Sequence, residues 1–421
     1  MKHIILGAGA SAISAARRIL KENSEDSIIM ISKDEKVYSR CMLHKLISGE
    51  RSEESINFIN DGLLESGRLL WIRGKTIDFL DGKEKKVYEG SREITSGNTI
   101  LIATGAESII PPIGQLRSAS NVFGLRHLTD ARAIIMACEK AQKIAIIGAG
   151  LVGLDAVYGI LEAGGKKEIH VMEMAPSILA INLDAHAAKA YQDLFEKKGV
   201  NFHLSGRVTE TICREEGKIS GLRLDNGLNI ECDMIIVAAG VRPATAFLEA
   251  KESASGIELN DRRAVKVNEY METNIAGIYA AGDAAGLSGI WPNAQKQGDI
   301  AAYNMTGTRM EYDDMFAMKN TVNFFGLHSL SLGIINPDEG DEVLIKEDRK
   351  NYRKLILREG IPVGIVLQGE IGGSGFWQHI IKNRIPLNNM NMGKKLISPW
   401  KQNYASFFGT EANGEYKWVH A

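Results

Sequence analysis

Short runs of apolar residues recur along the chain, and most of them end at or close to a glycine. The first run is Lys2–Leu6 and the second is residues 28–31, with a helical pattern over residues 11–21 between them. Continuous apolar runs of this length, separated by helical segments, are typical of strands buried on both faces of a parallel sheet. The beginning of the chain is therefore predicted to form a strand–helix–strand unit.

The same alternation returns in the middle of the chain. Lys143–Ile147 is an apolar run, a helical pattern continues to about Ala163, and residues 168–172 form the next run. Three more apolar runs end near glycine, at residues 99–106, 234–243 and 277–284. Together these segments predict an α/β fold with two Rossmann-like, doubly wound domains, in which the strand ends converge on ligands.

The pattern changes after about residue 315. Strands are predicted over residues 342–345, Tyr352–Arg358 and 363–367. The Glu359-Gly360 pair between the last two is typical of an antiparallel hairpin, and a short helix is predicted over residues 375–382. We therefore expect a small α+β domain at the carboxyl end.

Aromatic residues gather in the tail over residues 394–421. They are Trp400, Tyr404, Phe407, Phe408, Tyr416 and Trp418. Aromatic side chains suit both an apolar surface of the same subunit and an interface with a partner, so both interpretations stay open.

Composition narrows the class of protein. The 421 residues carry 50 Lys and Arg against 52 Asp and Glu, a net charge of −2, which gives no basic excess for nucleic acid or an anionic membrane. No apolar run has the length of a membrane helix, and the first run meets glycine at once, unlike a signal peptide. A cytoplasmic protein that binds neither nucleic acid nor membrane is expected.

The cysteines point to neither a metal site nor a disulfide framework. The four of them, Cys41, Cys138, Cys213 and Cys232, lie far apart and show no C-x-x-C spacing. We therefore expect no metal, and a reducing compartment fits. Glycine is abundant, at 43 residues, which suggests turns where the backbone passes close to a ligand.

The first apolar run leads into a G-x-G-x-x-A motif. Gly7 allows the tight turn, Gly9 lets backbone amides approach a pyrophosphate, and the small Ala12 lets helix and strand pack closely. Ala10 lies within the motif and Ser11 begins the predicted helix, whose positive end would meet the phosphate. Asp34 follows the second strand, where such folds place an acid on a ribose hydroxyl.

A second motif, G-x-G-x-x-G, follows residues 143–147. It consists of Gly148, Gly150 and Gly153, with Leu151 and Val152 between them. Glu173 ends the next strand and is followed by no arginine. Because an acid accepts a free 2′-hydroxyl whereas a 2′-phosphate needs a cation, NADH is favoured over NADPH. Two such motifs in strand–turn–helix contexts predict two dinucleotide sites.

The order of these motifs resembles the FAD-dependent pyridine-nucleotide oxidoreductases of the glutathione-reductase type. That order is G-x-G-x-x-A, A-T-G-A, G-x-G-x-x-G, A-A-G-V-R-P and A-G-D, and the resemblance covers residues 1–385. Three segments are similar to NADH:rubredoxin reductases and nitrite reductase large subunits, namely residues 38–43, 125–131 and 291–294. A fourth, residues 352–367, is similar to the small carboxy-terminal domain of the rubredoxin reductases.

The resemblance implies a domain scheme and a set of cofactor contacts. It implies an FAD domain at residues 1–112 and 245–316, an NAD domain at 113–244 and a third domain at 317–421. Asp34 would hold the adenosine ribose, Asp283 the ribityl chain, and Arg40 and Arg126 the FAD phosphate or flavin; a surface ion pair is the alternative for each arginine. Further cofactor contacts are expected at Ala103, Thr104, Gly105, Gly240, Gly282 and Pro292.

Three residues are candidates for the reactive centre. Cys41 matches the reactive cysteine of single-cysteine relatives, where a thiol near the flavin at a helix N-terminus could have a lowered pKa; a packing thiol is the alternative. Lys45 lies one helical turn beyond Cys41, and Asp155 follows the second glycine motif. In some relatives such residues pair beside flavin N5, whereas an ordinary salt bridge is the other interpretation.

The resemblance implies a function with open alternatives. Hydride would pass from NADH to flavin N5, and electrons would leave to a small redox protein such as rubredoxin. One alternative is a single-cysteine NADH oxidase or coenzyme A disulfide reductase that uses Cys41. Another is an NADH-binding flavoprotein with a regulatory role. A homodimer is also open.

Overall fold

The protein is described from a computed structural model that covers residues 1–59, 62–215, 217–249, 255–314, 319–387, 400, 408–410 and 416–418. The chain forms two compact units. Unit 1 comprises Met1–Gly148, Val152–His170 and Val208–Met315, and unit 2 comprises Ala149–Leu151, Val171–Arg207 and Phe316–Ala421. The domain scheme expected from the sequence stays a prediction, and its boundary at residues 316 and 317 lies outside the described residues.

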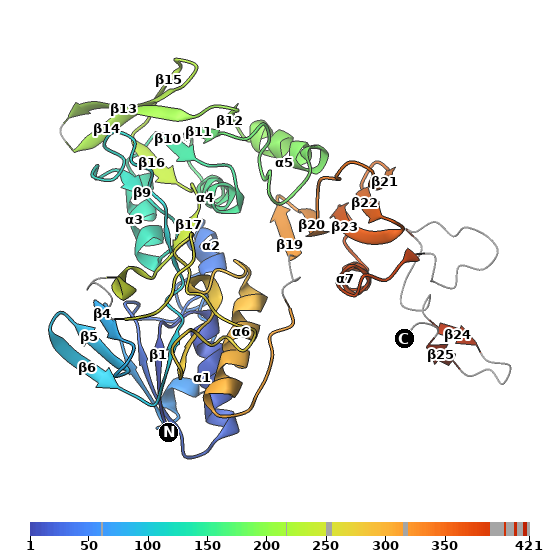
Figure 1. Ribbon diagram of the computed structural model, residues 1–421. Helices are drawn as coiled ribbons and strands as arrows, with labels where there is room; N and C mark the ends of the chain where they lie inside the picture. The colour runs from blue at the N-terminus through green and yellow to red at the C-terminus, as the bar shows by residue number, and fades with distance from the viewer. Residues whose placement is uncertain are drawn as a thin grey trace. The chain divides into compact units, whose positions relative to one another are not determined.

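Unit 1 is built on a five-stranded parallel sheet of order β18-β7-β1-β2-β3 (Figure 1). Its strands are β1 (Lys2–Leu6), β2 (Ser27–Ile31), β3 (Leu69–Ile72), β7 (Thr99–Ile102) and β18 (Ile278–Ala280). Ile4, Ile5 and Leu6 are completely buried, because both faces of the sheet are covered. The continuous apolar runs of the sequence are explained by this burial.

Two helices cover one face of this sheet, α1 (Ala10–Glu22) and α6 (Trp291–Met305). They approach closely at Gly298, where any Cβ would overlap the carbonyl oxygen of Ser11. A three-stranded antiparallel sheet of β4 (Phe79–Asp81), β5 (Lys86–Glu89) and β6 (Arg92–Ser96) packs on the opposite face through Leu80 and Val87. The layers therefore leave the carboxyl ends of the parallel strands free for a ligand.

A second set of parallel strands lies in unit 1. β10 (Lys143–Ile147) pairs with β16 (Met234–Val237), which pairs with β9 (Val122–Phe123). The helices of this part are α3 (Leu128–Cys138) and α4 (Leu151–Glu162). Two smaller antiparallel sheets belong to the same unit. One consists of β8 (Ala106–Ser108) and β17 (Val241–Pro243). The other consists of β13 (Val208–Glu215), β14 (Lys218–Leu224) and β15 (Asn229–Glu231).

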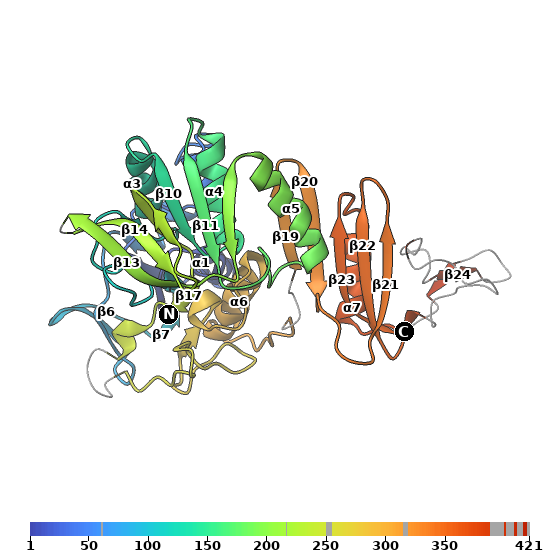
Figure 2. The ribbon, with the colours of Figure 1, turned by 90° about the horizontal axis from the view of Figure 1, so that it is seen from above.

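Unit 2 contains the end of β11 (Glu168–Glu173), α5 (Ala185–Lys197) and β12 (Val200–Leu204). Its main sheet is antiparallel, with the order β19-β20-β23-β22-β21 (Figure 2). The strands are β19 (Lys319–Phe324), β20 (Leu327–Gly333), β21 (Glu342–Glu347), β22 (Tyr352–Arg358) and β23 (Ile361–Gln368). The hairpin at Glu359-Gly360 is confirmed, and both residues have the positive φ of a tight hairpin turn, 52° and 77°.

Helix α5 joins the antiparallel sheet through buried polar contacts. The Tyr191 hydroxyl donates towards the carbonyls of Val322 and Leu327, at 3.1 and 2.7 Å. Asp184, which caps α5, accepts from the Tyr352 hydroxyl at 2.7 Å and pairs with Lys354 at 3.0 Å. These satisfied polar groups fix α5 on the sheet as one body.

The other face of this sheet packs on α7 (Ser374–Lys382) through Phe376, Trp377 and Ile380. Part of the aromatic tail is described. The Trp400 ring lies 6.2 Å from that of Trp377, and β24 (Phe408–Thr410) pairs with β25 (Tyr416–Trp418). Tyr404 and Phe407 lie outside the described residues.

The α/β architecture with parallel Rossmann-like sheets and a small α+β carboxy-terminal part is confirmed. Within the described part of the chain, no helix has the length and apolar character needed to cross a membrane.

Candidate functional site

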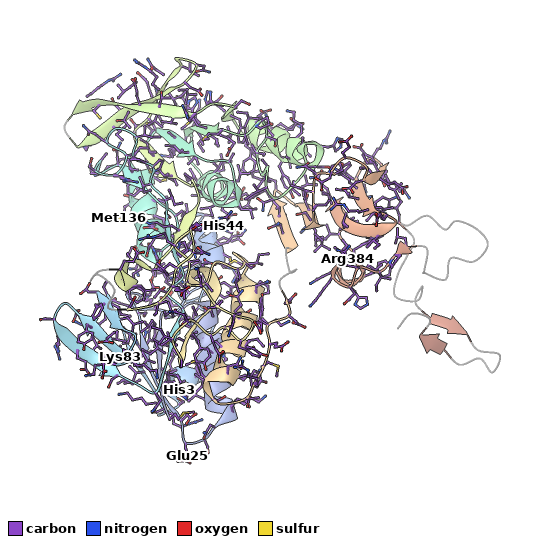
Figure 3. All side chains as sticks on the ribbon, in the orientation of Figure 1. His3, Glu25, His44, Lys83, Met136 and Arg384 are labelled. Atoms are coloured by element: carbon purple, nitrogen blue, oxygen red, sulfur yellow. The ribbon has the colours of Figure 1, made fainter. Side chains whose placement is uncertain are left out.

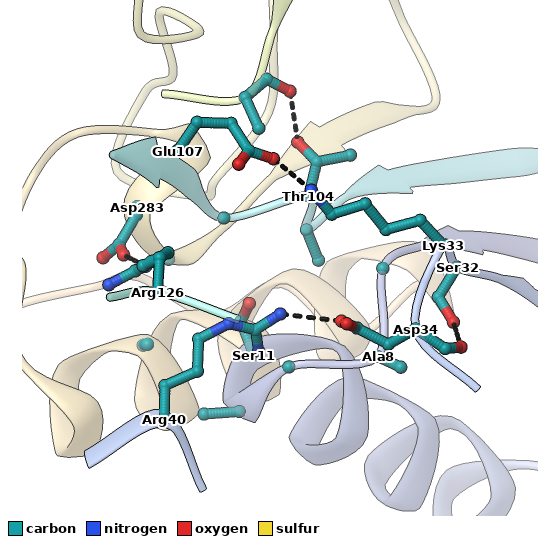
Figure 4. A pocket seen from close by; sticks show the side chains of 18 of the residues that line it. Ala8, Ser11, Ser32, Lys33, Asp34, Arg40, Thr104, Glu107, Arg126 and Asp283 are labelled. Carbon is teal, nitrogen blue, oxygen red and sulfur yellow. Dashed lines mark hydrogen bonds and ion pairs between the residues drawn. The ribbon is translucent and has the colours of Figure 1, made fainter. Parts of the chain in front are cut away.

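A pocket of about 270 Å³ opens in unit 1 at the carboxyl ends of β1, β2 and β7 (Figure 4). Many residues predicted from the sequence line it together, although they come from distant segments of the chain. They are Gly7, Gly9, Ala10, Ser11, Asp34, Arg40, Cys41, Ala103, Thr104, Gly105, Arg126, Gly282 and Asp283. Polar groups that converge at the ends of parallel strands are typical of a ligand site in a strand-end crevice.

The first glycine turn forms one wall of the pocket. Gly7 has φ of +120°, and an added Cβ would overlap the carbonyl oxygen of Ala103, so only glycine fits. Gly9 caps α1 without any side-chain hydrogen bond. Ala10 and Ser11, in the first turn of α1, line the pocket. Helix amides without a cap at a pocket wall suit a phosphate group, so these residues fit the pyrophosphate of FAD.

Asp34 and Arg40 neutralise each other on the pocket wall (Figure 4). Nη2 of Arg40 donates to Oδ2 of Asp34 at 2.7 Å, and the Tyr38 hydroxyl donates to Oδ1 at 2.9 Å. Both carboxylate oxygens of Asp34 therefore have a partner already. Burial of Tyr38 raises its pKa to about 12, so this hydroxyl remains a donor at neutral pH.

Arg126 and Asp283 form an ion pair on another part of the wall. The backbone of Arg126 is held by Asp130, whose carboxylate accepts from the N–H groups of Arg126 and His127, each at 2.8 Å. Nε of Arg126 donates to the carbonyl of Ala106 at 3.2 Å. The guanidinium is thus fixed just before α3 and lines the pocket together with the carboxylate of Asp283.

The sequence analysis missed a further charged cluster, in which Lys33 and Glu107 line the pocket and His127 contacts Glu107. Lys33 pairs with Glu107, and Nε2 of His127 lies 2.7 Å from the other carboxylate oxygen. Burial alone would raise the pKa of Glu107, but the hydrogen bonds with His127 and Lys33 lower it to about 2. Glu107 directly follows the A-T-G-A motif in the sequence, and this position could have identified it as a pocket residue.

Several predicted contacts lie away from the lining. Ala12 is buried in the core under α1, in the packing role expected for a small residue there. Pro292 is exposed in the first turn of α6, whereas its neighbour Trp291 lines the pocket. Gly240 has φ of +100° and accepts from the N–H of Ile109 at 3.0 Å. The lining residues that the sequence did not single out include Lys75, Thr76 and Phe247.

The expectation of a lowered thiol pKa at Cys41 is wrong. Cys41 lies exposed on the pocket wall, in the 3-10 turn Arg40–Met42. Although the residue as a whole is exposed, neighbouring protein atoms displace part of the water around its thiol. This desolvation raises the pKa of the thiol, and the negative charge of Asp155 raises it further. Arg126 and Arg40 oppose these effects without overcoming them. The thiol is therefore protonated at neutral pH.

Lys45 pairs with Glu50 rather than with Asp155. Nζ of Lys45 lies 2.5 Å from the Glu50 carboxylate and 4.9 Å from the centre of the Tyr158 ring. Oδ1 of Asp155 lies instead 3.7 Å from Nδ1 of His44, a residue of α2 (Leu43–Ile47; Figure 3). The reason is the close packing of α2 on α4 at Gly159, where a Cβ would lie 2.7 Å from the carbonyl oxygen of His44.

The pair of Asp155 and His44 is desolvated. Burial, only partly offset by Lys45, raises the pKa of Asp155 to about 7. Burial and then the charge of Lys45 lower the pKa of His44 to about 4, so His44 is neutral near pH 7. Asp155 is therefore the group of this cluster that titrates near neutral pH.

The second glycine turn has the geometry that its motif predicts. Gly148 has φ of +106°, and a Cβ at Gly148 or at Gly153 would overlap a backbone carbonyl oxygen, of Ala238 or of Gly148 respectively. A Cβ at Gly150 would meet open space. Leu151 and Val152 begin α4, and the Val152 side chain is exposed. The turn is thus tight on its inner side and open at Gly150.

In unit 2, the carboxylate of Glu173 holds two backbone amides. It accepts from Ala149 at 2.7 Å and from Ala175 at 2.8 Å. The next residue, Met174, is 68 % exposed, and no cation follows. Charge-assisted bonds of this kind fix the carboxylate beside the glycine turn.

Comparison with known proteins assigns the fold and the sequence to one family. Residues 1–298 match the family model described as pyridine nucleotide-disulphide oxidoreductase, and residues 319–385 match the rubredoxin NAD+ reductase C-terminal domain. The chain belongs to the pyridine nucleotide-disulphide oxidoreductase family. Members of this family are NAD(P)H-dependent oxidoreductases that use FAD, and the resemblance noted in the sequence is confirmed.

Relatives of this oxidoreductase carry different names. It is 28 % identical to the nitrite reductase [NAD(P)H] of Bacillus subtilis over 87 % of this chain but only 45 % of that protein, so it spans less than half of that relative. It is 30 % identical to an NADH oxidase of Methanocaldococcus jannaschii, over 74 % of this chain and 71 % of that protein.

The NADH-rubredoxin oxidoreductase of Clostridium acetobutylicum is 26 % identical over 92 % of this chain and 99 % of its own length. Its solved structure superposes with a TM-score of 0.75 over 92 % of this chain and 96 % of that one, at 24 % identity.

Proposed function

We propose that this oxidoreductase is an FAD-dependent NADH oxidoreductase that delivers electrons one at a time to a small redox protein such as rubredoxin. The observation that carries the proposal is the match of residues 319–385 to a rubredoxin reductase carboxy-terminal domain. This domain follows, in the same chain, a part with two dinucleotide motifs that matches the oxidoreductase family. A relative whose alignment with this chain covers 99 % of its own length is named for the same reaction.

The unit 1 pocket is the proposed FAD site. The uncapped start of α1 would bind the pyrophosphate, since Gly9 leaves the amides of Ala10 and Ser11 accessible. Arg126 would bring positive charge to the phosphate or the flavin, and Asp283 would bind the ribityl hydroxyls. When FAD is bound, it supplies the redox chemistry, because it accepts a hydride and releases electrons singly.

The preference for NADH is proposed from Glu173. Its carboxylate lies beside the second glycine turn, where it would accept a ribose hydroxyl and repel a 2′-phosphate. Met174 is the next residue, and neither it nor Ala175 can supply the positive charge that NADPH requires.

Cys41 is proposed as a packing thiol of the pocket wall. A coenzyme A disulfide reductase or a thiol-dependent oxidase would use the thiolate of this residue, which its raised pKa disfavours. The proposed role of Lys45 is electrostatic, and this role requires no proton transfer by Lys45. Its side chain pairs with Glu50, yet its charge still lowers the pKa of Asp155.

The test is a comparison of electron acceptors with the purified holoenzyme. NADH oxidation is measured with a rubredoxin, coenzyme A disulfide, oxygen and peroxide under identical conditions, for the natural chain and for Cys41→Ser. The proposal expects fast turnover with rubredoxin in both forms. Preference for coenzyme A disulfide that Cys41→Ser abolishes would contradict it, as would slow turnover with every acceptor, which is the behaviour of a regulatory flavoprotein.

A further inference from the structure

The antiparallel sheet of unit 2 has an apolar face and a polar face, and both are buried. The apolar face, which includes Leu330, Leu332 and Leu355, packs on α7. Side chains alternate between the two faces along β20, β22 and β23. The polar face consists of Ser329, Ser331, Tyr352, Lys354 and Gln368, each at most 8 % exposed. Buried polar side chains need partners, so this face makes specific contacts rather than simple apolar ones.

Two of these side chains hold the backbone that leads into α5. The Ser331 hydroxyl donates to the carbonyl of Asn182 at 2.6 Å. Nε2 of Gln368 donates to the carbonyl of Ala187 at 2.9 Å. Because a buried carbonyl that loses its donor is costly, these bonds fix the course of residues 182–187 on the sheet.

Two more polar side chains of this face hold Asp184, whose side chain is 6 % exposed. Its carboxylate accepts from the Tyr352 hydroxyl at 2.7 Å and pairs with Nζ of Lys354 at 3.0 Å. The other carboxylate oxygen caps α5 by accepting from the N–H of Ala187 at 3.0 Å. A buried charge with these partners has one favourable position, so the start of α5 is fixed by the sheet.

The same segment continues to the second glycine turn. The N–H of Asn182 donates to the carbonyl of Leu179 at 2.7 Å, and the N–H of Leu179 donates to the carbonyl of Ala149 at 2.9 Å. Leu179 is buried and has φ of +51°, a conformation that persists in a leucine where its surroundings hold it. The N–H of Ala149 in turn donates to Glu173. Linked contacts therefore lead from Ser331 to Glu173 within unit 2.

We propose that the polar face of this sheet positions the second glycine turn for NADH, with Ser331, Tyr352 and Lys354 as positioning residues. The inference rests on the proposed function, in which Glu173 lies at the NADH site. The three residues act through the backbone of residues 179–187 and need no contact with the nucleotide. The affinity for the nucleotide therefore depends on the sheet, whereas the rate at which bound NADH reacts does not.

The test is the binding of NAD+ to the full, FAD-loaded chain, measured by calorimetry at one ionic strength. NAD+ does not reduce the flavin, so binding is measured without turnover. Tyr352→Phe and Ser331→Ala each remove one hydrogen bond and add no charge. Each is expected to raise the Kd for NAD+ by about three-fold to thirty-fold. The limiting rate of flavin bleaching at saturating NADH is expected to stay within about two-fold.

β22 offers a matched pair of charge removals. Lys354→Met removes the ion pair with Asp184 on the polar face and is expected to raise the Kd for NAD+. Arg353→Met is the control, because Arg353 is the next residue back along the same strand, lies on the opposite face and pairs with Glu370 at 3.1 Å. The control is expected to leave the Kd unchanged.

Hydrogen exchange on the natural chain gives a measurement that does not depend on how the variants fold. Coupling between two parts of a protein is reciprocal, so NAD+ bound at the turn also stabilises the contacts of the sheet. Amide exchange in β20 and β22 is expected to slow when NAD+ is added. The antiparallel sheet of β4, β5 and β6 in unit 1 is the reference, and its exchange is expected to stay unchanged.

Three results would overturn the positioning role while leaving the proposed function intact. One is a Kd for NAD+ that is the same in the natural chain and in the variants of Ser331, Tyr352 and Lys354. Another is exchange in β20 and β22 that NAD+ fails to slow. The third is an equal rise of the Kd in Arg353→Met, which would reduce the effect to a general loss of sheet stability. A natural chain that binds no NAD+ would contradict the proposed function and this inference together.

Discussion

Glu173 offers a direct perturbation of the choice between NADH and NADPH. Its carboxylate accepts from the amides of Ala149 and Ala175, at 2.7 and 2.8 Å, so its charge is fixed in place. Glu173→Gln keeps the size of the side chain and one accepting oxygen but removes the charge. We expect the variant to lose much of its discrimination against NADPH.

The magnitude follows from the charge and its surroundings. Two unit charges about 4 Å apart interact by about 4 kcal/mol at an effective dielectric constant of about 20. Glu173 is only half-buried and salt screens the interaction, so we expect about a third of this value to remain. The ratio of kcat/KM for NADPH to that for NADH should therefore rise by roughly ten-fold. NADH itself should bind a few-fold more weakly, since one charge-assisted bond to the turn is lost.

The assay is steady-state oxidation of both nucleotides with one artificial acceptor at fixed ionic strength. Glu168→Gln, at the opposite end of β11, is the matched control and should leave the ratio unchanged. The reasoning would be refuted by an unchanged NADPH to NADH ratio in Glu173→Gln, or by an equal change in the control.

Three further predictions concern the pocket and the glycine turn. Cys41→Ser should keep rubredoxin reduction within a few-fold of the natural chain, because the thiol is neutral; a loss of about a hundred-fold in turnover would assign it a redox role. Gly153→Ala should lower the melting temperature, since its Cβ overlaps Gly148, whereas Gly150→Ala should fold normally and raise the KM for NADH; equal melting temperatures would contradict the packing. Asp155→Asn should stabilise the protein, by no more than about 4 kcal/mol. The reason is that burial raises the pKa of Asp155 to about 7 in the folded protein, above the value in the unfolded chain. Ionisation of this carboxyl therefore destabilises the fold increasingly as the pH rises from about 4 to 7. Denaturant unfolding at pH 5 and pH 8 tests this, and a gain that shrinks at the higher pH would disprove it.

The sequence was sufficient for the strands and the glycine turns because their causes are local. A continuous apolar run such as Lys2–Leu6 specifies a strand buried on both faces. The positive φ of Gly7 and Gly148 is also a local property of their turns, although the carbonyl oxygens that exclude a Cβ there come from distant parts of the chain, at Ala103 and Ala238. The pocket residues converge for the same reason, since the carboxyl ends of adjacent parallel strands lie at one edge of the sheet.

Side-chain partners in the candidate reactive centre could not be predicted in this way. The pairing of Asp155 with His44 depends on the close approach of α2 to α4 at Gly159, which no local pattern specifies. Lys45 finds Glu50 within its own segment, so spacing along a helix did not identify its partner. The pKa of Cys41 depends on desolvation and on a carboxylate more than a hundred residues away in the chain, Asp155.

The proposed hydride transfer from NADH is tested most directly by anaerobic rapid mixing of the FAD-loaded protein with NADH, followed by rubredoxin. The account predicts that NADH bleaches the visible absorbance of the flavin much faster than NADPH does, and that rubredoxin restores the absorbance as the protein acceptor becomes reduced. An absorbance that NADH leaves unchanged, or that NADH bleaches and rubredoxin fails to restore, would contradict it.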